Sequence, residues 1–178
     1  YQNEEWINEG IHQVLMHIKY LYDKKSGLFY HGWTFNGNNN FGGIFWCRGN
    51  SWFTLGILDY IDMFKGTLNP GVKTIIVDTY KAQVKALKKL QAPSGLWHTV
   101  LTDASSYEEV SGSAAIACGI LKGIRMGILD DSYLPCAEKA IKGIMKNIDK
   151  DGTVLNVVNT AKLYAEPVYQ DVTMALGS

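Results

Sequence analysis

The stretch that decides the fold is "SGSAAIACGILKGI" (residues 111–124), which is apolar or small almost all the way round a helix. A helix of that composition is usually buried on most of its sides. A second segment of the same kind, "WFTLGILDYIDMF" (52–64), occurs earlier in the chain. The sequence therefore predicts two inner helices, and the small residues of the first would let a neighbouring helix approach closely: Gly112, Ala114, Ala115, Ala117 and Gly119.

Three other segments combine apolar residues at helical spacing with a polar opposite face. They cover residues 7–22, 72–90 and 133–148. The second is entered through Asn69-Pro70, a favourable pair for the N-cap and the first helical position. These segments are expected to be outer helices with one face in solvent, so outer and inner helices alternate along the chain.

A similar turn follows each amphipathic segment: "KKSGLFYHGW" (24–33), "APSGLWHTVL" (92–101) and, more weakly, "DKDGTVLNVV" (149–158). Gly95 lies 68 residues after Gly27, and Gly152 lies 57 residues after Gly95. Repeats of this period indicate stacked helical hairpins. After each glycine we expect a strand of two or three residues at most.

Alternating outer and inner helices define an all-α fold, an (α/α) toroid of helical hairpins. In such a toroid the loops 26–50, 94–110 and 151–172 would open at one end of the ring. The chain holds about two and a half hairpins, so part of a ring is expected. A helical solenoid or an irregular bundle is the alternative.

Composition excludes several classes of protein. The 178 residues suit one domain, and the 17 basic and 17 acidic residues give a net charge of zero. Neither nucleic acid nor an anionic membrane is therefore expected as a partner, and no apolar run approaches the ~20 residues of a membrane span. No signal peptide is visible, and three widely spaced cysteines indicate buried free thiols in a reducing, cytoplasmic compartment: Cys47, Cys118 and Cys136.

The first loop, "GLFYHGWTFNGNNNFGGIFWCRGNSW" (27–52), is unusually rich in aromatic residues and asparagine. Tryptophan faces stack on sugar rings, and the guanidinium of Arg48 could hold a carboxylate by two hydrogen bonds. With Asn50 or Ser51 as the expected N-cap, a helix N-terminus would add a preference for anions. These features suit an acidic sugar. The alternative is that the tryptophans fill the core and Arg48 ties loops together.

Two further candidates receive structural interpretations. His98 follows the second turn, and a structural role is favoured over a place at the ligand site. In "SYEEV" (106–110), Ser106 or one of the carboxylates Glu108 and Glu109 is expected to cap the next helix.

The order of four motifs resembles a known family: "YDKKSGLFYHGW" (22–33), "FWCRGNSW" (45–52), "SGLWHTVL" (94–101) and "SYEEVSGSAAIACGILKGIRMGIL" (106–129). Together they resemble the unsaturated glucuronyl and rhamnogalacturonyl hydrolases of glycoside hydrolase families 88 and 105, the latter more closely. The resemblance extends over roughly residues 10–160 and implies an (α/α)6 barrel, without cofactor or metal. Residues 1–178 would then form a single all-α domain that lacks the N-terminal hairpins of the barrel.

The resemblance also implies a reaction. Family enzymes act on acidic oligosaccharides left by polysaccharide lyases, as in bacterial pectin degradation, whose terminal sugar carries a C4–C5 double bond. A carboxylic acid protonates C4, water adds at C5, and the resulting hemiketal opens to release the remaining sugar. The substrate-binding residues implied by the resemblance are His31, Trp33, Trp46, Arg48, Asn50 and Trp52.

The catalytic residue of this chain is unknown, because the family's catalytic Asp is expected upstream of Tyr1. The nearest carboxylates, Asp23, Asp59 and Asp62, are not assigned catalysis. We therefore expect no activity from this chain alone, and a non-catalytic sugar-binding or helical interaction module is the alternative function. Exposed inner helices of a part-ring would also favour self-association.

Overall fold

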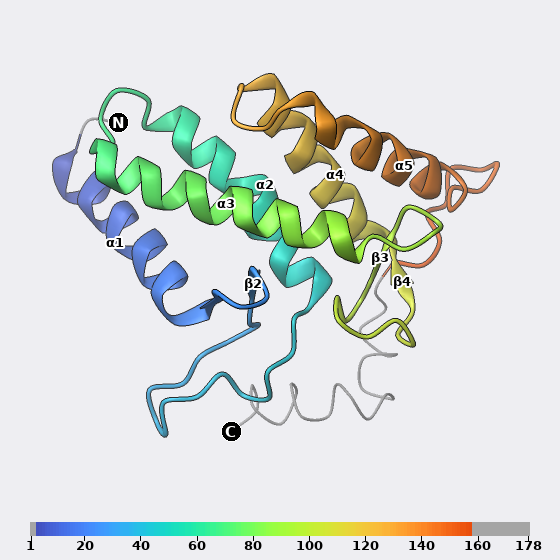
Figure 1. Cartoon of the computed structure of the whole chain (residues 1–178), viewed down its shortest axis with the longest axis horizontal. Coiled ribbons are helices and arrows are strands. Elements are labelled where there is room, and N and C mark those ends of the chain that lie inside the picture. The colour runs from blue at the N-terminus through green and yellow to red at the C-terminus, as the bar shows by residue number, and fades with distance from the viewer. Residues whose placement is uncertain (1–2, 158–178) are drawn as a thin grey trace.

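The computed structural model describes residues 3–157 as helices joined at one end by long loops (Figure 1). The helices are α1 (Glu4–Leu21), α2 (Cys47–Met63), α3 (Pro70–Leu90), α4 (Val110–Arg125) and α5 (Leu134–Met145), with a short 3₁₀ helix, η1 (Asp131–Tyr133). Four two-residue strands accompany them: β1 (Tyr22–Asp23), β2 (Leu28–Phe29), β3 (Trp97–His98) and β4 (Glu108–Glu109). Helices α1 and α5 lie at opposite ends of the row, and α3 crosses in front of α2 and α4 (Figure 1).

Helices α2 and α4 form the inner pair that the sequence predicts. Glycines of α4 face α2 so closely that a Cβ on Gly119 would lie 2.6 Å from the carbonyl oxygen of Thr54. A Cβ on Gly112 would lie 2.8 Å from the sulfur of Cys47. Gly119 thus lets the two backbones come into direct contact, whereas Gly112 leaves room for the side chain of Cys47.

Helix α3 covers the inner pair from outside. Its buried face carries Ile76, Tyr80, Val84 and Leu87, and the Tyr80 hydroxyl donates to the carbonyl of Gly119 at 2.9 Å. Asn69 is its N-cap and accepts from the backbone N–H of Gly71 at 2.8 Å, so the predicted start is confirmed. None of the helices within residues 3–157 is long and apolar enough to cross a membrane.

The two Ser-Gly-Leu turns have the predicted form. Gly27 and Gly95 adopt φ angles of 77° and 99°, which side chains other than glycine's rarely accept. Strand β2 pairs antiparallel with β1, and β3 pairs antiparallel with β4. Each strand has only two residues, as expected.

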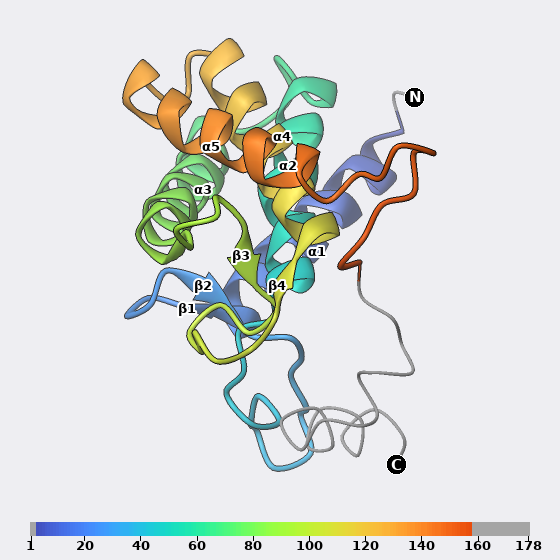
Figure 2. The ribbon, with the colours of Figure 1, turned by 90° about the vertical axis from the view of Figure 1, so that its right-hand side faces the viewer.

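The loops gather at one end of the helices, which Figure 2 shows from the side. The backbone N–H of Cys47 donates to Thr99 at 2.9 Å, and that of Leu101 donates to Phe45 at 2.9 Å. The third loop joins them where Val110 donates to the carbonyl of Asn156 at 3.0 Å. The predicted common mouth is confirmed for these segments, and the third loop beyond residue 157 lies outside the described residues.

Two expectations are wrong in detail. Helix α2 begins at Cys47 with Trp46 as N-cap, and not after Asn50 or Ser51. The physical reason is that the second loop accepts the hydrogen bond of the first helical N–H, so the helix can start earlier than side-chain capping signals indicate. Cys118 is exposed, whereas Cys47 and Cys136 are buried as expected.

Candidate functional site

The centre of the candidate site is the indole of Trp46 at the start of α2. The guanidinium carbon of Arg48 lies 4.8 Å from the centroid of this ring, within cation–π distance. The ring of His31 meets the same indole edge-on, with centroids 4.9 Å apart and an interplanar angle of 85°. The fold thus brings together three predicted site residues that the sequence places in two separate motifs.

A glycine missed by the sequence analysis makes this cluster possible. A Cβ on Gly49 would lie 3.1 Å from the Trp46 ring and 3.6 Å from Nδ1 of His31. A side chain there would crowd the Trp46 ring, which would have to shift by a few tenths of an ångström, and would lie at ordinary contact distance from His31. No local signal marked this glycine, because the helix was expected to start after it, with Asn50 or Ser51 as N-cap.

Trp52 extends the candidate site along α2. It lies four residues after Arg48, so the two side chains share one face of the helix. Its side chain is 69% exposed, although tryptophan is highly buried on average. An aromatic surface next to a guanidinium is therefore open to a ligand on this face.

Asn50 has a different place from the one predicted. Its side chain accepts from the backbone N–H of Phe29 at 2.8 Å and donates to the carbonyls of Phe29 and Trp46 at 2.9 and 3.0 Å. The residue is only 1% exposed. It therefore ties the first turn to α2 behind the site, which corrects its assignment as a substrate contact.

The sequence analysis also missed the partner of Asn50. Gln83 of α3 is fully buried; its Nε2 donates to the carbonyl of Asn50 at 3.0 Å and its Oε1 accepts from Thr54 at 2.9 Å. A glutamine on an amphipathic helix usually faces solvent, but Gln83 lies three residues after Tyr80 and four before Leu87, and this place on the apolar face was the available signal. This buried network fixes the first turn, α2 and α3 relative to one another.

Trp33 lies in the loop between β2 and α2, with its ring 5.6 Å from that of Tyr20. The indole nitrogens of Trp33 and Trp46 are buried and have no hydrogen-bond partner within residues 3–157. Leaving a buried donor unpaired costs about 1–3 kcal/mol.

The two histidines near the loops differ in their roles. Burial lowers the pKa of His31, so its imidazole is neutral at pH 7 and offers one donor and one acceptor. His98 holds its Nδ1 2.5 Å from the carbonyl oxygen of Ser106 and so fastens the second loop to β3. This is the structural role favoured for His98.

Glu109 is the predicted cap of the next helix. Its carboxylate accepts from the backbone N–H groups of Ser111 at 3.0 Å and Gly112 at 2.5 Å, and the residue is fully buried. The prediction that a carboxylate of this segment caps α4 is confirmed. A carboxylate there also complements the positive end of the helix dipole.

The three carboxylates nearest to the candidate site in the sequence lie away from the Trp46 cluster. Asp23 accepts from the backbone of Ser26 at 3.0 Å in the first turn, and Asp59 pairs with Lys122 of α4. Asp62 lines a cleft at the opposite end of the helices, beside the start of α3. No hydrogen bond or ion pair among residues 3–157 joins these three carboxylates to the cluster around Trp46.

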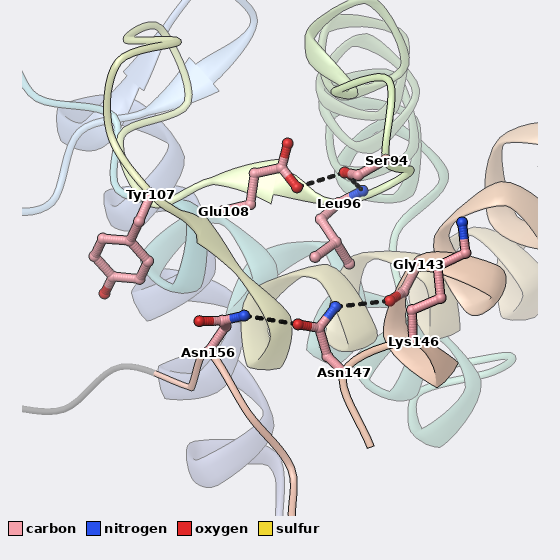
Figure 3. Close-up of a pocket in the computed structure, with 8 residues that line it drawn as sticks. All are labelled: Ser94, Leu96, Tyr107, Glu108, Gly143, Lys146, Asn147 and Asn156. Carbon is pink, nitrogen blue, oxygen red and sulfur yellow. Dashed lines mark hydrogen bonds between the residues drawn. The ribbon is translucent and has the colours of Figure 1, made fainter. Parts of the chain in front are cut away.

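A second, polar pocket lies between the second turn, β4 and the end of α5 (Figure 3). It has a volume of ≈ 310 Å³. Four of its polar side chains form two pairs: Ser94 donates to Glu108 at 2.5 Å, and Asn156 donates to Asn147 at 2.7 Å. Because these partners are already engaged, the pocket is best described as a joint between the turn and α5.

Alternating inner and outer helices with their loops gathered at one end define the class of the (α/α) toroids. The family described as Glycosyl Hydrolase Family 88 matches residues 1–175, and the chain belongs to this family. The family resemblance and the toroid fold expected from the sequence are thereby confirmed.

Individual relatives agree with this membership. The chain is 33% identical over 156 residues to the unsaturated rhamnogalacturonyl hydrolase YesR of Bacillus subtilis, covering 88% of this chain and 43% of that protein. It is 30% identical to an unsaturated 3S-rhamnoglycuronyl hydrolase of an Alteromonas species, covering 89% and 39%. A crystal structure of a possible member of the GH105 family from Salmonella enterica superposes with a TM-score of 0.84 at 42% identity, covering 87% and 41%. The chain thus spans less than half the length of each of these proteins.

Proposed function

We propose that these residues belong to a hydrolase of unsaturated uronyl oligosaccharides and that they form its carboxylate-binding wall. The observation that carries the proposal is the cluster in which Trp46 lies between Arg48 and His31. Such a cluster combines a flat apolar surface, a fixed cation and a neutral hydrogen-bonding ring. The names of the relatives support the substrate class, since both are hydrolases of unsaturated uronyl sugars.

Each side chain has a defined task in this proposal. Arg48 pairs with the carboxylate of the terminal sugar, because a guanidinium presents two parallel donors. Trp46 and Trp52 contact the faces of the sugar rings. The neutral imidazole of His31 bonds a hydroxyl or the ring oxygen.

The chemistry in this proposal is hydration of the C4–C5 double bond. A carboxylic acid delivers a proton to C4, water adds to C5, and the hemiketal opens and releases the rest of the oligosaccharide. The described residues bind and orient the sugar, which lowers the entropic part of the barrier. The proton donor is not assigned, because Asp23, Asp59 and Asp62 have other surroundings.

We also propose a bacterial, cytoplasmic setting in the breakdown of pectin-derived oligosaccharides. Three free cysteines, two of them buried, support a reducing compartment. The bacterial sources of the relatives support the origin.

Calorimetry with a lyase-generated unsaturated disaccharide and with its saturated counterpart tests the function. We expect the chain to bind the unsaturated sugar preferentially. Absence of binding to both sugars would overturn the proposed function and leave a helical interaction module. In parallel, the ultraviolet absorbance of the double bond should stay constant with this chain alone, and a steady fall would show that the chain contains its own proton donor.

A further inference from the structure

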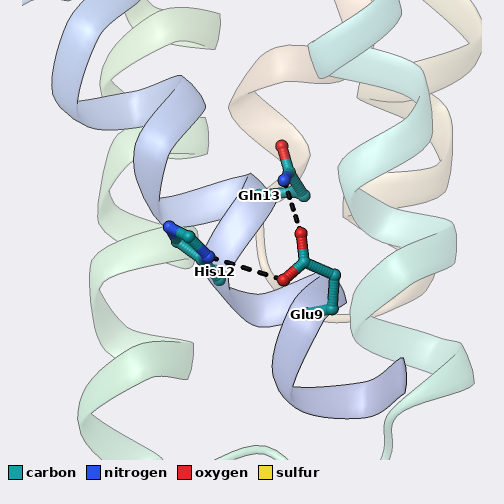
Figure 4. A network of polar contacts seen from close by, with 3 residues as sticks. All are labelled: Glu9, His12 and Gln13. Atoms are coloured by element: carbon teal, nitrogen blue, oxygen red, sulfur yellow. Dashed lines mark hydrogen bonds and ion pairs between the residues drawn. The ribbon is translucent and has the colours of Figure 1, made fainter. Parts of the chain in front are cut away.

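Gln83 of the outer helix α3 has an unusual environment for a glutamine. Gln13 of α1 shows the ordinary one: it is exposed and donates to Glu9 of the same helix at 2.6 Å, beside His12 (Figure 4). Gln83 is instead fully buried, and its side chain reaches across to the inner helix α2. The reason for a buried amide at this position must therefore lie in its partners.

Gln83 makes hydrogen bonds to two residues of α2. Its Nε2 donates to the carbonyl oxygen of Asn50 at 3.0 Å and lies 3.3 Å from Oδ1 of the same residue. Its Oε1 accepts from the hydroxyl of Thr54 at 2.9 Å. Replacing a buried hydrogen-bonded pair by apolar groups of the same shape can be neutral for stability, so stability alone does not explain an amide here. Directional bonds do, however, fix a distance and an orientation between two helices.

Asn50 connects Gln83 to the backbone on both sides of the Trp46 cluster. Its Oδ1 accepts from the N–H of Phe29 at 2.8 Å, and its Nδ2 donates to the carbonyl oxygens of Phe29 and Trp46 at 2.9 and 3.0 Å. Phe29 lies two residues before His31, whereas Trp46 is the N-cap of α2. The bonds of one buried amide thus join the segment that carries His31 to the helix that begins after Trp46.

Helix α3 also contacts the first turn directly. At Gly27 a Cβ would lie 3.1 Å from the carbonyl oxygen of Ala82 and 3.1 Å from the Cβ of Ala86. Ala82 and Ala86 lie on either side of Gln83 in the sequence of α3, so the turn and the amide rest on the same stretch of this helix. The outer helix therefore supports both segments of the cluster, although the cluster itself contains no residue of α3.

We propose that Gln83 is a positioning residue of the candidate sugar site: acting through Asn50, it sets the distance between His31 and Trp46. The two rings meet edge-on with centroids 4.9 Å apart, a contact that depends on where each backbone is held. A site whose groups are fixed before the sugar arrives loses less conformational freedom on binding. The effect on sugar affinity rests on the proposed function, whereas the effect on the two rings does not.

Gln83→Met tests the proposal, because methionine is unbranched and apolar, cannot donate to Asn50 and is at most a weak acceptor. NMR spectroscopy of the His31 ring protons, identified by their absence in His31→Ala, reports the contact with Trp46 without any ligand. We expect these signals to move toward those of an exposed histidine in Gln83→Met. Calorimetry should show that affinity for a lyase-generated unsaturated disaccharide falls about ten- to a hundredfold, the usual size when a group that orients a binding residue is removed.

The matched control is Tyr80→Phe, which removes a different buried hydrogen bond of α3, from the Tyr80 hydroxyl to the carbonyl of Gly119 at 2.9 Å. It should lower the midpoint temperature of unfolding but leave the His31 signals and the sugar affinity unchanged. Circular dichroism shows whether each variant is folded. If Gln83→Met does not fold, Thr54→Val takes its place: it removes the hydroxyl that donates to Gln83 and should move the His31 signals in the same direction by a smaller amount.

A double-mutant cycle separates positioning from a general loss of structure. When His31 is already replaced by alanine, Gln83→Met should weaken sugar binding much less than in the unmodified chain, because no ring remains to be placed. Additive losses would overturn the proposal, and so would unchanged His31 signals in a folded Gln83→Met or Thr54→Val chain. An unmodified chain that does not bind the disaccharide would contradict the proposed function instead, and the NMR measurement would then decide the positioning role by itself.

Discussion

Replacing Gly119 by alanine tests the close contact between the inner helices. A Cβ there would lie 2.6 Å from the carbonyl oxygen of Thr54 and 2.9 Å from its carbonyl carbon. These are backbone atoms of α2, so they cannot rotate away as a side chain could. Relief requires α2 and α4 to separate. Since Thr54 lies one turn after Asn50, the buried network behind the proposed sugar site would move as well.

The expected size follows from two opposing effects. Alanine is favoured over glycine inside a helix by about 0.5–1 kcal/mol. Forcing a methyl group into a filled contact costs typically about 1–3 kcal/mol. The net effect of Gly119→Ala is therefore a loss of roughly 0–2.5 kcal/mol in the free energy of unfolding, with about 1 kcal/mol as the central value. Gly56→Ala is the matched control, because Gly56 lies within α2 and has nothing within 4 Å of its Cβ position. The Gly56→Ala variant should gain about 0.5–1 kcal/mol in the free energy of unfolding.

Urea and thermal unfolding of the two variants and the unmodified chain measure this difference. A gap of roughly 2 kcal/mol corresponds to about 4–8 °C between the midpoints for a chain of this size. Measurements at several protein concentrations separate folding from association. Equal midpoints for Gly119→Ala and Gly56→Ala would show that the glycine does not set the distance between the helices.

Three further predictions concern the site and the thiols. Arg48→Lys should weaken binding of the unsaturated disaccharide by roughly 1.5–3 kcal/mol, about ten- to a hundredfold, because lysine cannot form the paired planar contact with a carboxylate. The midpoint temperature of unfolding should change little. Unchanged affinity with a lowered midpoint temperature would mean that Arg48 only ties loops together. Burial lowers the pKa of His31 in the folded chain below its ordinary 6.5, so as the pH falls the unfolded chain takes up a proton on this residue before the folded chain does. The contribution of neutral His31 to the free energy of unfolding is therefore fully present above about pH 6.5 and is lost as the pH falls below that value. Unfolding between pH 7.5 and 5 should therefore show a shallower loss for His31→Gln, and an identical slope would contradict the burial argument. A thiol reagent should modify the exposed Cys118 rapidly in the folded chain. It should react with Cys47 and Cys136 only on unfolding, because both are buried and burial raises the pKa of their thiols. Equally fast modification of all three cysteines would contradict the described packing.

Much of the fold could be predicted from local signals. The order of outer and inner helices follows from periodicity, which a helix imposes on every third or fourth residue. The turns were marked by Gly27 and Gly95, where the backbone needs a positive φ angle, and α3 by Asn69 and Pro70. The aromatic loop predicted a ligand site, because exposed tryptophan needs a reason, and that site is a proposal. These signals act within a few residues, so the sequence alone determined them.

Tertiary structure decided what each polar residue of the loop does. Arg48 and Asn50 are neighbours in one motif, yet α2 turns Arg48 toward Trp46 and buries Asn50 against Phe29. Helix α2 starts at Cys47 because the second loop, some fifty residues later, accepts its first hydrogen bond. A polar side chain on a helix is compatible with solvent, a ligand or a distant backbone group, and its own sequence neighbourhood is the same in each case. The choice depends on which segment packs against it, and only the folded chain brings that segment there.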